Sequence, residues 1–184
     1  MKQSTKAIVG VIALVLFLGG AAVVYNILSR EVTPEIEMVE SDGSDRRRAP
    51  DFTVIDTAGN QVNLSDLIVN EQPIVVNFWA SWCPPCKEEM PDFENVYQDL
   101  GDEVQFMMVS VVDGRRETIE SATQFVAEGG FTFPVYFDTE QEGARAYGIQ
   151  AIPTTIFIDS NGNIVHEILG KIDEETLRKG IDSL

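Results

Sequence analysis

A Cys-Pro-Pro-Cys segment, residues 83–86, holds both cysteines of the chain and follows almost directly on an apolar run. That run, residues 73–79 (PIVVNFW), has the continuous hydrophobicity of a strand covered on both faces of a sheet. Pro84 suits the first turn of a helix, where its missing N–H costs no hydrogen bond, and a helix is expected over residues 84–100. A buried strand leading into a helix that begins at a cysteine pair limits the fold to the α/β class.

The rest of residues 49–184 fits one α/β domain. Expected strands cover residues 52–55, 61–64, 73–79, 104–112, 133–137, 154–159 and 163–169, and expected helices cover 84–100, 117–128, 143–147 and 173–184. Turn-rich segments at 56–60 and 160–162 predict two hairpins. This order predicts a mixed central sheet with helices on both faces.

The N-terminal segment predicts a membrane anchor. Residues 7–28 carry no charge and as a helix would span roughly 33 Å, about the thickness of a bilayer's hydrocarbon core. Gly20-Ala21-Ala22 also fits a signal-peptide cleavage site, but apolar residues continue to Leu28, which favours an uncleaved anchor. We therefore expect a cytoplasmic tail (1–6), a single transmembrane signal anchor (7–28), a flexible linker (29–48) and an extracytoplasmic domain (49–184) at the cell membrane.

The formal net charge of −17 lies entirely on residues 49–184, since the six basic and six acidic residues before them cancel. A domain this acidic repels phosphate backbones, which argues against nucleic acid as a partner and would suit a basic protein substrate.

Two cysteines can hold a metal, form a structural staple or carry redox chemistry. Structural zinc needs four nitrogen or sulfur ligands, and the single histidine, His166, stands far along the chain, where a solvent-facing strand position is the simplest interpretation. A disulfide that closes a four-residue loop removes little unfolded-state entropy and is a poor staple. Redox chemistry fits best: Cys83 at a helix N-terminus is favoured as a thiolate that attacks a disulfide, and Cys86 resolves the mixed disulfide.

Several motifs together resemble the membrane-anchored TlpA/ResA-type proteins of the thioredoxin superfamily. They are VVNFW followed by WCPPC at 75–86, APDF and LSDL at 49–52 and 64–67, GFTFPV at 130–135, and IPTT at 152–155. The resemblance covers residues 49–184 and implies a thioredoxin-like fold with an N-terminal β-hairpin and an extra helix. We also expect a monomeric enzyme that needs no cofactor or metal.

The resemblance also implies roles for individual residues. Pro153 would be a cis-proline opposite the dithiol, and Glu89 an acidic residue that tunes the dithiol pKa; both join Cys83 and Cys86 as expected catalytic residues. Trp82 would shield Cys83, and Trp79 would belong to the core. The expected substrate-binding residues are Trp82, Pro84, Pro85, Ile152 and Pro153. One departure is Asn77, because thioredoxins keep a buried aspartate at that position and an amide cannot accept a proton.

The two prolines predict the direction of the reaction. Neither Pro84 nor Pro85 has an N–H, so the N–H of Cys86 remains as the main local donor to a Cys83 thiolate. A strongly oxidising dithiol needs a highly stabilised thiolate, so we expect a reductant. The resemblance implies electrons from a transporter-type membrane donor and, as one substrate, the CxxCH haem site of apocytochrome c.

Other functions share part of this pattern. A general dithiol oxidase or isomerase of secreted proteins would have the same fold and a different potential. A peroxidase would need a basic residue near the cysteine, and none closely precedes Cys83. A non-enzymatic peptide-binding module is a further alternative, although it would not need two thiols.

Overall fold

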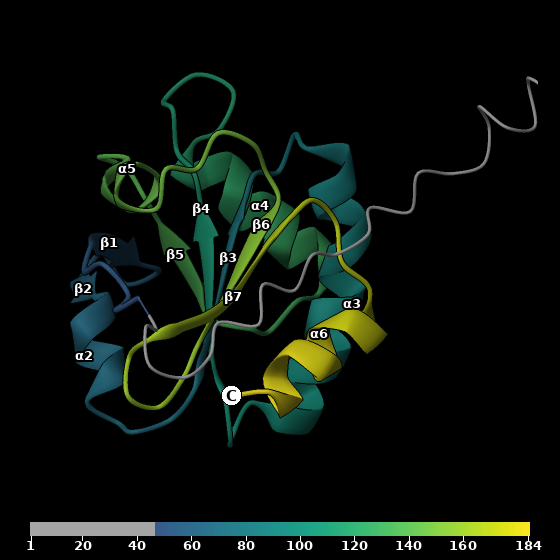
Figure 1. Cartoon of the computed structure of the whole chain (residues 1–184). Coiled ribbons are helices and arrows are strands. Elements are labelled where there is room, and N and C mark those ends of the chain that lie inside the picture. Colours follow the sequence, from purple (N-terminus) through teal and green to yellow (C-terminus); the bar gives the residue numbers. More distant parts are fainter. Residues whose placement is uncertain (1–46) are drawn as a thin grey trace, which may run out of the picture. The chain divides into compact units, whose positions relative to one another are not determined.

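Seven strands form one mixed sheet in residues 47–184, the part of the chain that the structure, a computed structural model, describes (Figure 1). The strand order is β2-β1-β5-β4-β3-β6-β7. In chain order the strands are β1 (Thr53–Asp56), β2 (Gln61–Asn63), β3 (Ile74–Trp79), β4 (Gln105–Ser110), β5 (Val135–Phe137), β6 (Thr154–Ile158) and β7 (Ile164–Leu169). β3 pairs in parallel with β4 and β4 with β5, whereas β3–β6, β6–β7, β1–β2 and β1–β5 are antiparallel.

Helices cover both faces of this sheet. They are α2 (Leu64–Ile68), α3 (Pro84–Leu100), α4 (Ile119–Gly129), α5 (Glu142–Ala146) and α6 (Glu174–Asp182). One apolar cluster joins the sheet to α3, α4 and α6, and a second joins the opposite face to α2 and to Tyr147, directly after α5. The thioredoxin-like α/β fold with a mixed sheet and an N-terminal hairpin is therefore confirmed.

The strand that leads to the cysteines lies inside the sheet. β3 is hydrogen-bonded on one side to β4 and on the other to β6, and all six of its residues are buried. This burial on both faces is the physical reason for its unbroken apolar run. Trp79, at its end, belongs to the core as expected and packs against Phe125 with ring centroids 5.6 Å apart.

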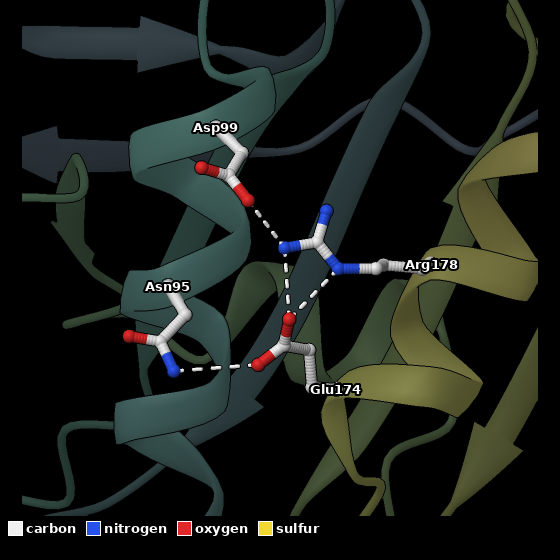
Figure 2. A network of polar contacts seen from close by, with 4 residues as sticks. All are labelled: Asn95, Asp99, Glu174 and Arg178. Carbon is white, nitrogen blue, oxygen red and sulfur yellow. Dashed lines mark hydrogen bonds and ion pairs between the residues drawn. The ribbon is translucent and has the colours of Figure 1, made fainter.

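Helix α6 lies alongside α3, joined by polar contacts (Figure 2). The Arg178 guanidinium bonds to Asp99 on α3 and to Glu174 on its own helix, and Asn95 donates to Glu174 over 3.3 Å. Helix α3 itself continues through Pro91 without a break in its assigned range.

The predicted elements are present to within two residues at each end, but α2 was missed. It begins directly after Asn63, whose backbone N–H and side-chain amide donate to Asp66 over 3.0 and 2.9 Å. The strand expected over residues 61–64 therefore ends at Asn63, because this local capping arrangement starts a helix at Leu64.

His166 also differs from expectation. It is half-buried and lies edge-on to Phe157, with ring centroids 6.3 Å apart. The interpretation that His166 faces solvent is therefore wrong in part, because the ring of Phe157 packs against it.

Paired backbone begins before the predicted domain start. Arg48 forms a β-bridge with Asn163, and the N–H of Ile164 donates to the carbonyl oxygen of Arg47 over 2.8 Å. The predicted tail, span and most of the linker lie outside the described residues. Within residues 47–184, none of the helices combines the length and the apolar character needed to cross a bilayer.

Candidate active site

Cys83 occupies the N-cap of α3, four residues after the end of β3 at Trp79. Its sulfur accepts a hydrogen bond from the backbone N–H of Cys86 over 3.3 Å. Pro84 and Pro85 fill the first two helical positions, so Cys86 is the first residue of the helix that can offer an N–H to the cap. The positive end of the helix dipole and this one N–H favour negative charge on the Cys83 sulfur.

The two cysteines form a disulfide with Cα atoms 5.3 Å apart. Cys83 is 3% exposed and Cys86 is fully buried, so a partner's sulfur can reach only the first of them without rearrangement. This asymmetry matches the expected division between an attacking Cys83 and a resolving Cys86.

The loop before β6 faces this pair. The Ile152–Pro153 peptide bond is cis, the conformation that the resemblance implies. The carbonyl oxygen of Ile152 lies 3.7 Å from the Cys83 sulfur, within reach of a thiol donor when the pair is reduced. Ile152 is half-buried and Pro153 is buried.

The structure places Trp82, Pro84 and Pro85 on the surface beside Cys83, where all three are exposed. A partner that docks on Cys83 would meet these side chains together with the Ile152–Pro153 loop. The expected substrate-binding residues are thus gathered around one sulfur, although their role remains a prediction.

Glu89 is fully buried on α3, one helical turn beyond Cys86. One carboxylate oxygen accepts from the Asn77 amide over 2.9 Å and the other from the Ile172 backbone N–H over 3.1 Å. Burial raises the pKa of Glu89 to about 7, against the lowering effect of the Ile172 and Asn77 bonds and of the Lys171 charge. Glu89 therefore changes charge close to neutral pH on the buried side of the helix that carries the dithiol, and it is not an exposed helical glutamate.

Asn77 connects this carboxyl to the neighbouring strand. Its amide also donates to the Thr155 hydroxyl over 3.1 Å, and Asn77 and Thr155 are register partners between β3 and β6. Sequence reasoning noted Asn77 as a departure but missed its bond to Glu89 and the part played by Thr155. The available signal was a polar residue in the middle of an otherwise apolar strand, which when buried must find hydrogen-bond partners.

A second buried carboxylate, which sequence reasoning missed, holds the loop before Cys83. Glu117 is fully buried and accepts from the Ser81 backbone N–H at 2.9 Å, the Ser81 hydroxyl at 2.7 Å and the Ser110 hydroxyl at 2.9 Å. Its neighbour Arg116 places its guanidinium 3.6 Å from the centre of the Trp82 ring. The segment between β4 and α4 is thereby attached to the active-site loop.

Known proteins share this arrangement. Residues 45–183 match the family model described as Redoxin. The chain is similar to the thiol-disulfide oxidoreductase ResA of Geobacillus thermodenitrificans, with 29% identity over 187 residues that cover 100% of this chain and 99% of the relative. The ResA of Bacillus subtilis is 33% identical over 138 residues, which cover 74% of this chain and 72% of the relative.

A solved structure agrees with these sequence relatives. The crystal structure of StoA from Bacillus subtilis superposes with a TM-score of 0.62 at 27% identity, over 72% of this chain and 96% of that one. Together with the Cys83–Cys86 pair at the start of α3, these findings place the chain in the redoxin family, as a ResA-type, thioredoxin-like thiol-disulfide oxidoreductase.

Proposed function

We propose that this oxidoreductase works as a reductant tethered to the outer face of the cell membrane, and that it reduces disulfides of envelope proteins such as the CxxCH haem site of apocytochrome c. The observation that carries the direction is the single N–H, that of Cys86, which donates to the Cys83 sulfur. The charge-free run over residues 7–28 supports the tether, and similarity to the ResA proteins supports the pathway.

The proposed cycle moves two electrons. The Cys83 thiolate attacks one sulfur of the substrate disulfide, which forms a mixed disulfide and releases the other substrate sulfur as a thiolate. Cys86 then loses its proton and attacks the Cys83 sulfur, which releases the substrate as a dithiol and leaves the Cys83–Cys86 disulfide. A transporter-type membrane donor returns two electrons and two protons to this pair.

Burial and charge assign the supporting roles. Glu89, which titrates near pH 7, acts as a positioning residue that sets the local field for deprotonation of Cys86. The carbonyl of Ile152, beside the Cys83 sulfur, and the backbone around Pro153 would pair with an extended substrate segment, as a strand added to a sheet edge does.

The test is the reduction potential of the full-length chain in a non-ionic detergent, measured against dithiothreitol and glutathione buffers. A potential of about −250 mV or lower, in the thioredoxin range, is expected for a reductant, whereas a value near −120 mV would identify an oxidase. A Cys83 pKa near 4 would equally contradict the proposed direction, because it would indicate a highly stabilised thiolate.

A trapping experiment separates exchange from simple binding. In a Cys86→Ala variant the resolving thiol is absent, so an exchange enzyme should accumulate a mixed disulfide through Cys83 with its substrate. A Cys83→Ala variant is the matched control. A non-enzymatic binding module would retain partners without any bond that dithiothreitol breaks.

A further inference from the structure

Three basic residues are linked to the dithiol by chain position or by the contact with Trp82, although the chain as a whole is strongly acidic. Residues 49–184 contain seven basic and twenty-four acidic residues, and three of those seven are Lys87, Arg115 and Arg116. Lys87 follows Cys86 directly, Arg116 lies over the Trp82 ring beside Cys83, and Arg115 is its neighbour. All three side chains are exposed. We call these three residues the basic rim.

The rim is held in place by the protein. Glu117 binds both the N–H and the hydroxyl of Ser81, which fixes the residue after Arg116 to the residue before Trp82. A second carboxyl group of the loop, that of Asp113, accepts backbone N–H groups from Arg115, Arg116 and Glu117 over 2.8, 2.8 and 3.0 Å. These bonds hold the backbone of the loop, and the guanidinium of Arg116 stacks on the ring of Trp82, the residue before Cys83.

Most other basic groups of the domain are already neutralised. Lys171 pairs with Glu88 at 2.9 Å, Arg178 with Asp99 and Glu174, and Lys179 with Glu175 at 2.7 Å. Within residues 47–184, no rim residue forms an ion pair of this kind.

We propose that the basic rim binds acidic side chains that flank the disulfide of a protein substrate, an inference that rests on the proposed disulfide exchange. Charged groups at the edge of an interface steer encounter and select partners more than they add affinity. The net charge of the whole chain suggested a basic substrate, but the charges that a docking segment would meet around Cys83 have the opposite sign. Arg116 is the central residue, because its planar group is stacked on Trp82, the residue directly before Cys83.

The first test measures the field at Cys83 without any substrate. The reduced full-length chain, in a non-ionic detergent, is alkylated with iodoacetate, an anion, and with neutral iodoacetamide. The rate with iodoacetate divided by the rate with iodoacetamide should fall on the order of threefold in Arg116→Gln at low ionic strength, as expected for the loss of one positive charge near the sulfur. Arg116→Lys should keep most of the ratio, because it keeps the charge.

Lys179→Gln is the matched control, since it removes one positive charge from the turn of α6 that lies beside the far end of α3. It should leave the ratio as in the unmodified chain. The proposal that the basic rim attracts anions would be refuted if the ratio did not fall with added salt. It would also be refuted if Arg116→Gln and the unmodified chain gave the same ratio.

The second test uses two peptides that contain one intramolecular disulfide, Cys-Ala-Ala-Cys, flanked on both sides by two glutamates or by two lysines. The acidic peptide should be reduced with the higher kcat/KM through a lower KM, and Arg116→Gln should narrow the difference by about threefold. Equal rates for both peptides at low ionic strength would refute substrate selection. If neither peptide is reduced, the proposed function fails, and the alkylation ratio alone decides whether the rim acts on anions.

Discussion

Glu89 does not behave as an ordinary glutamate in the folded protein. Its carboxyl is fully buried and accepts hydrogen bonds from Asn77 and Ile172, yet burial outweighs these bonds and raises its pKa to about 7. At a pH between 4.5 and about 7, Glu89 therefore keeps its proton in the folded protein, whereas the unfolded chain has released it. Folding and protonation of this group are linked.

This linkage predicts a specific loss of stability with pH. Between pH 4.5, the ordinary pKa of glutamate, and about pH 7 the folded state binds more protons than the unfolded state, so stability falls as pH rises. The contribution of Glu89 amounts to about 3 kcal/mol across that window. In Glu89→Gln this contribution should vanish, and the difference in unfolding free energy between pH 5 and pH 8 should shrink accordingly.

Urea unfolding of the oxidised full-length chain, followed by the fluorescence of Trp79 and Trp82, measures this difference. The substitution alters the hydrogen bonds of residue 89 at both pH values. Their cost therefore cancels when the unfolding free energies of one variant at the two pH values are subtracted. Glu88→Gln, which changes an exposed carboxyl one position away, should keep the pH dependence of the unmodified chain. An unchanged slope in Glu89→Gln would show that the buried carboxyl titrates normally.

At the scale of elements, the start of α3 determines how strongly a Cys83 thiolate is stabilised. Cys83 is the N-cap, Pro84 and Pro85 follow, and the third helical residue, Cys86, donates to the sulfur. N-cap side chains accept from the second or third helical residue, so Pro85 removes one of the two possible donors. Pro84 stands at the first position, from which a donor rarely reaches the cap.

Pro85→Ala should therefore lower the pKa of Cys83, whereas Pro84→Ala should change it much less. A hydrogen bond to a charged group contributes about 1.5–3 kcal/mol, which corresponds to a shift of about one to two pKa units. Alkylation of the reduced chain with iodoacetamide as a function of pH measures both variants. Equal shifts in the two would mean that the loss of proline rigidity, rather than the added N–H, is responsible.

The segment between β4 and α4 is attached to the active site through Glu117, and this attachment should be strong. Glu117→Ala leaves the N–H and hydroxyl of Ser81 and the hydroxyl of Ser110 without their acceptor. The expected cost is about 3 kcal/mol of unfolding free energy, because unsatisfied buried polar groups are each expensive.

The exposed Glu120 in the first turn of α4 offers a matched control. Glu120→Ala should cost less than about 1 kcal/mol, since it loses only a favourable interaction with the helix dipole. Chemical denaturation of both variants at one pH is sufficient. The role given to Glu117 would be wrong if the two substitutions destabilised the protein equally.

At the scale of the whole molecule, repulsion among like charges opposes folding. The chain has a formal net charge of −17, and all of it falls on residues 49–184. The Arg178 ion pairs, with Asp99 on α3 and with Glu174 on its own helix (Figure 2), are partly open to solvent, and each contributes no more than about 1 kcal/mol. Added salt therefore screens many repulsions between acidic groups, whereas the attractions that it screens contribute little to stability.

Added salt should raise the thermal stability of the chain. Between about 20 mM and 0.5 M NaCl, screening becomes effective over a few ångströms, and we expect Tm to rise by roughly 3–5 °C, the equivalent of about 1 kcal/mol for a protein of this size. Thermal unfolding followed by circular dichroism, with the pH held constant, measures the change. A Tm that falls with salt would mean that the surface ion pairs outweigh the net repulsion.

Local patterns in the sequence determined the elements and the identity of the reacting pair. The apolar run of β3, the prolines at the start of α3 and the turn at 160–162 each express a short-range preference of the backbone or of a buried strand, so they could be interpreted without knowledge of the fold. The position of Cys83 at a helix N-terminus follows from the same local rules. The short helix α2 was missed because three residues of capping signal are weaker than a strand pattern that runs into them.

Tertiary structure alone decided how distant residues act on that pair. Hydrogen bonds link Asn77 to Glu89, Glu89 to Ile172 and Ser81 to Glu117. They form because strands and helices that are far apart in the chain pack on one another. Burial, which raises the pKa of Glu89, is a property of that packing and has no local signal in the sequence. The same holds for Arg116, whose place over Trp82 follows from the parallel pairing of β3 with β4, which brings the ends of both strands to one edge of the sheet.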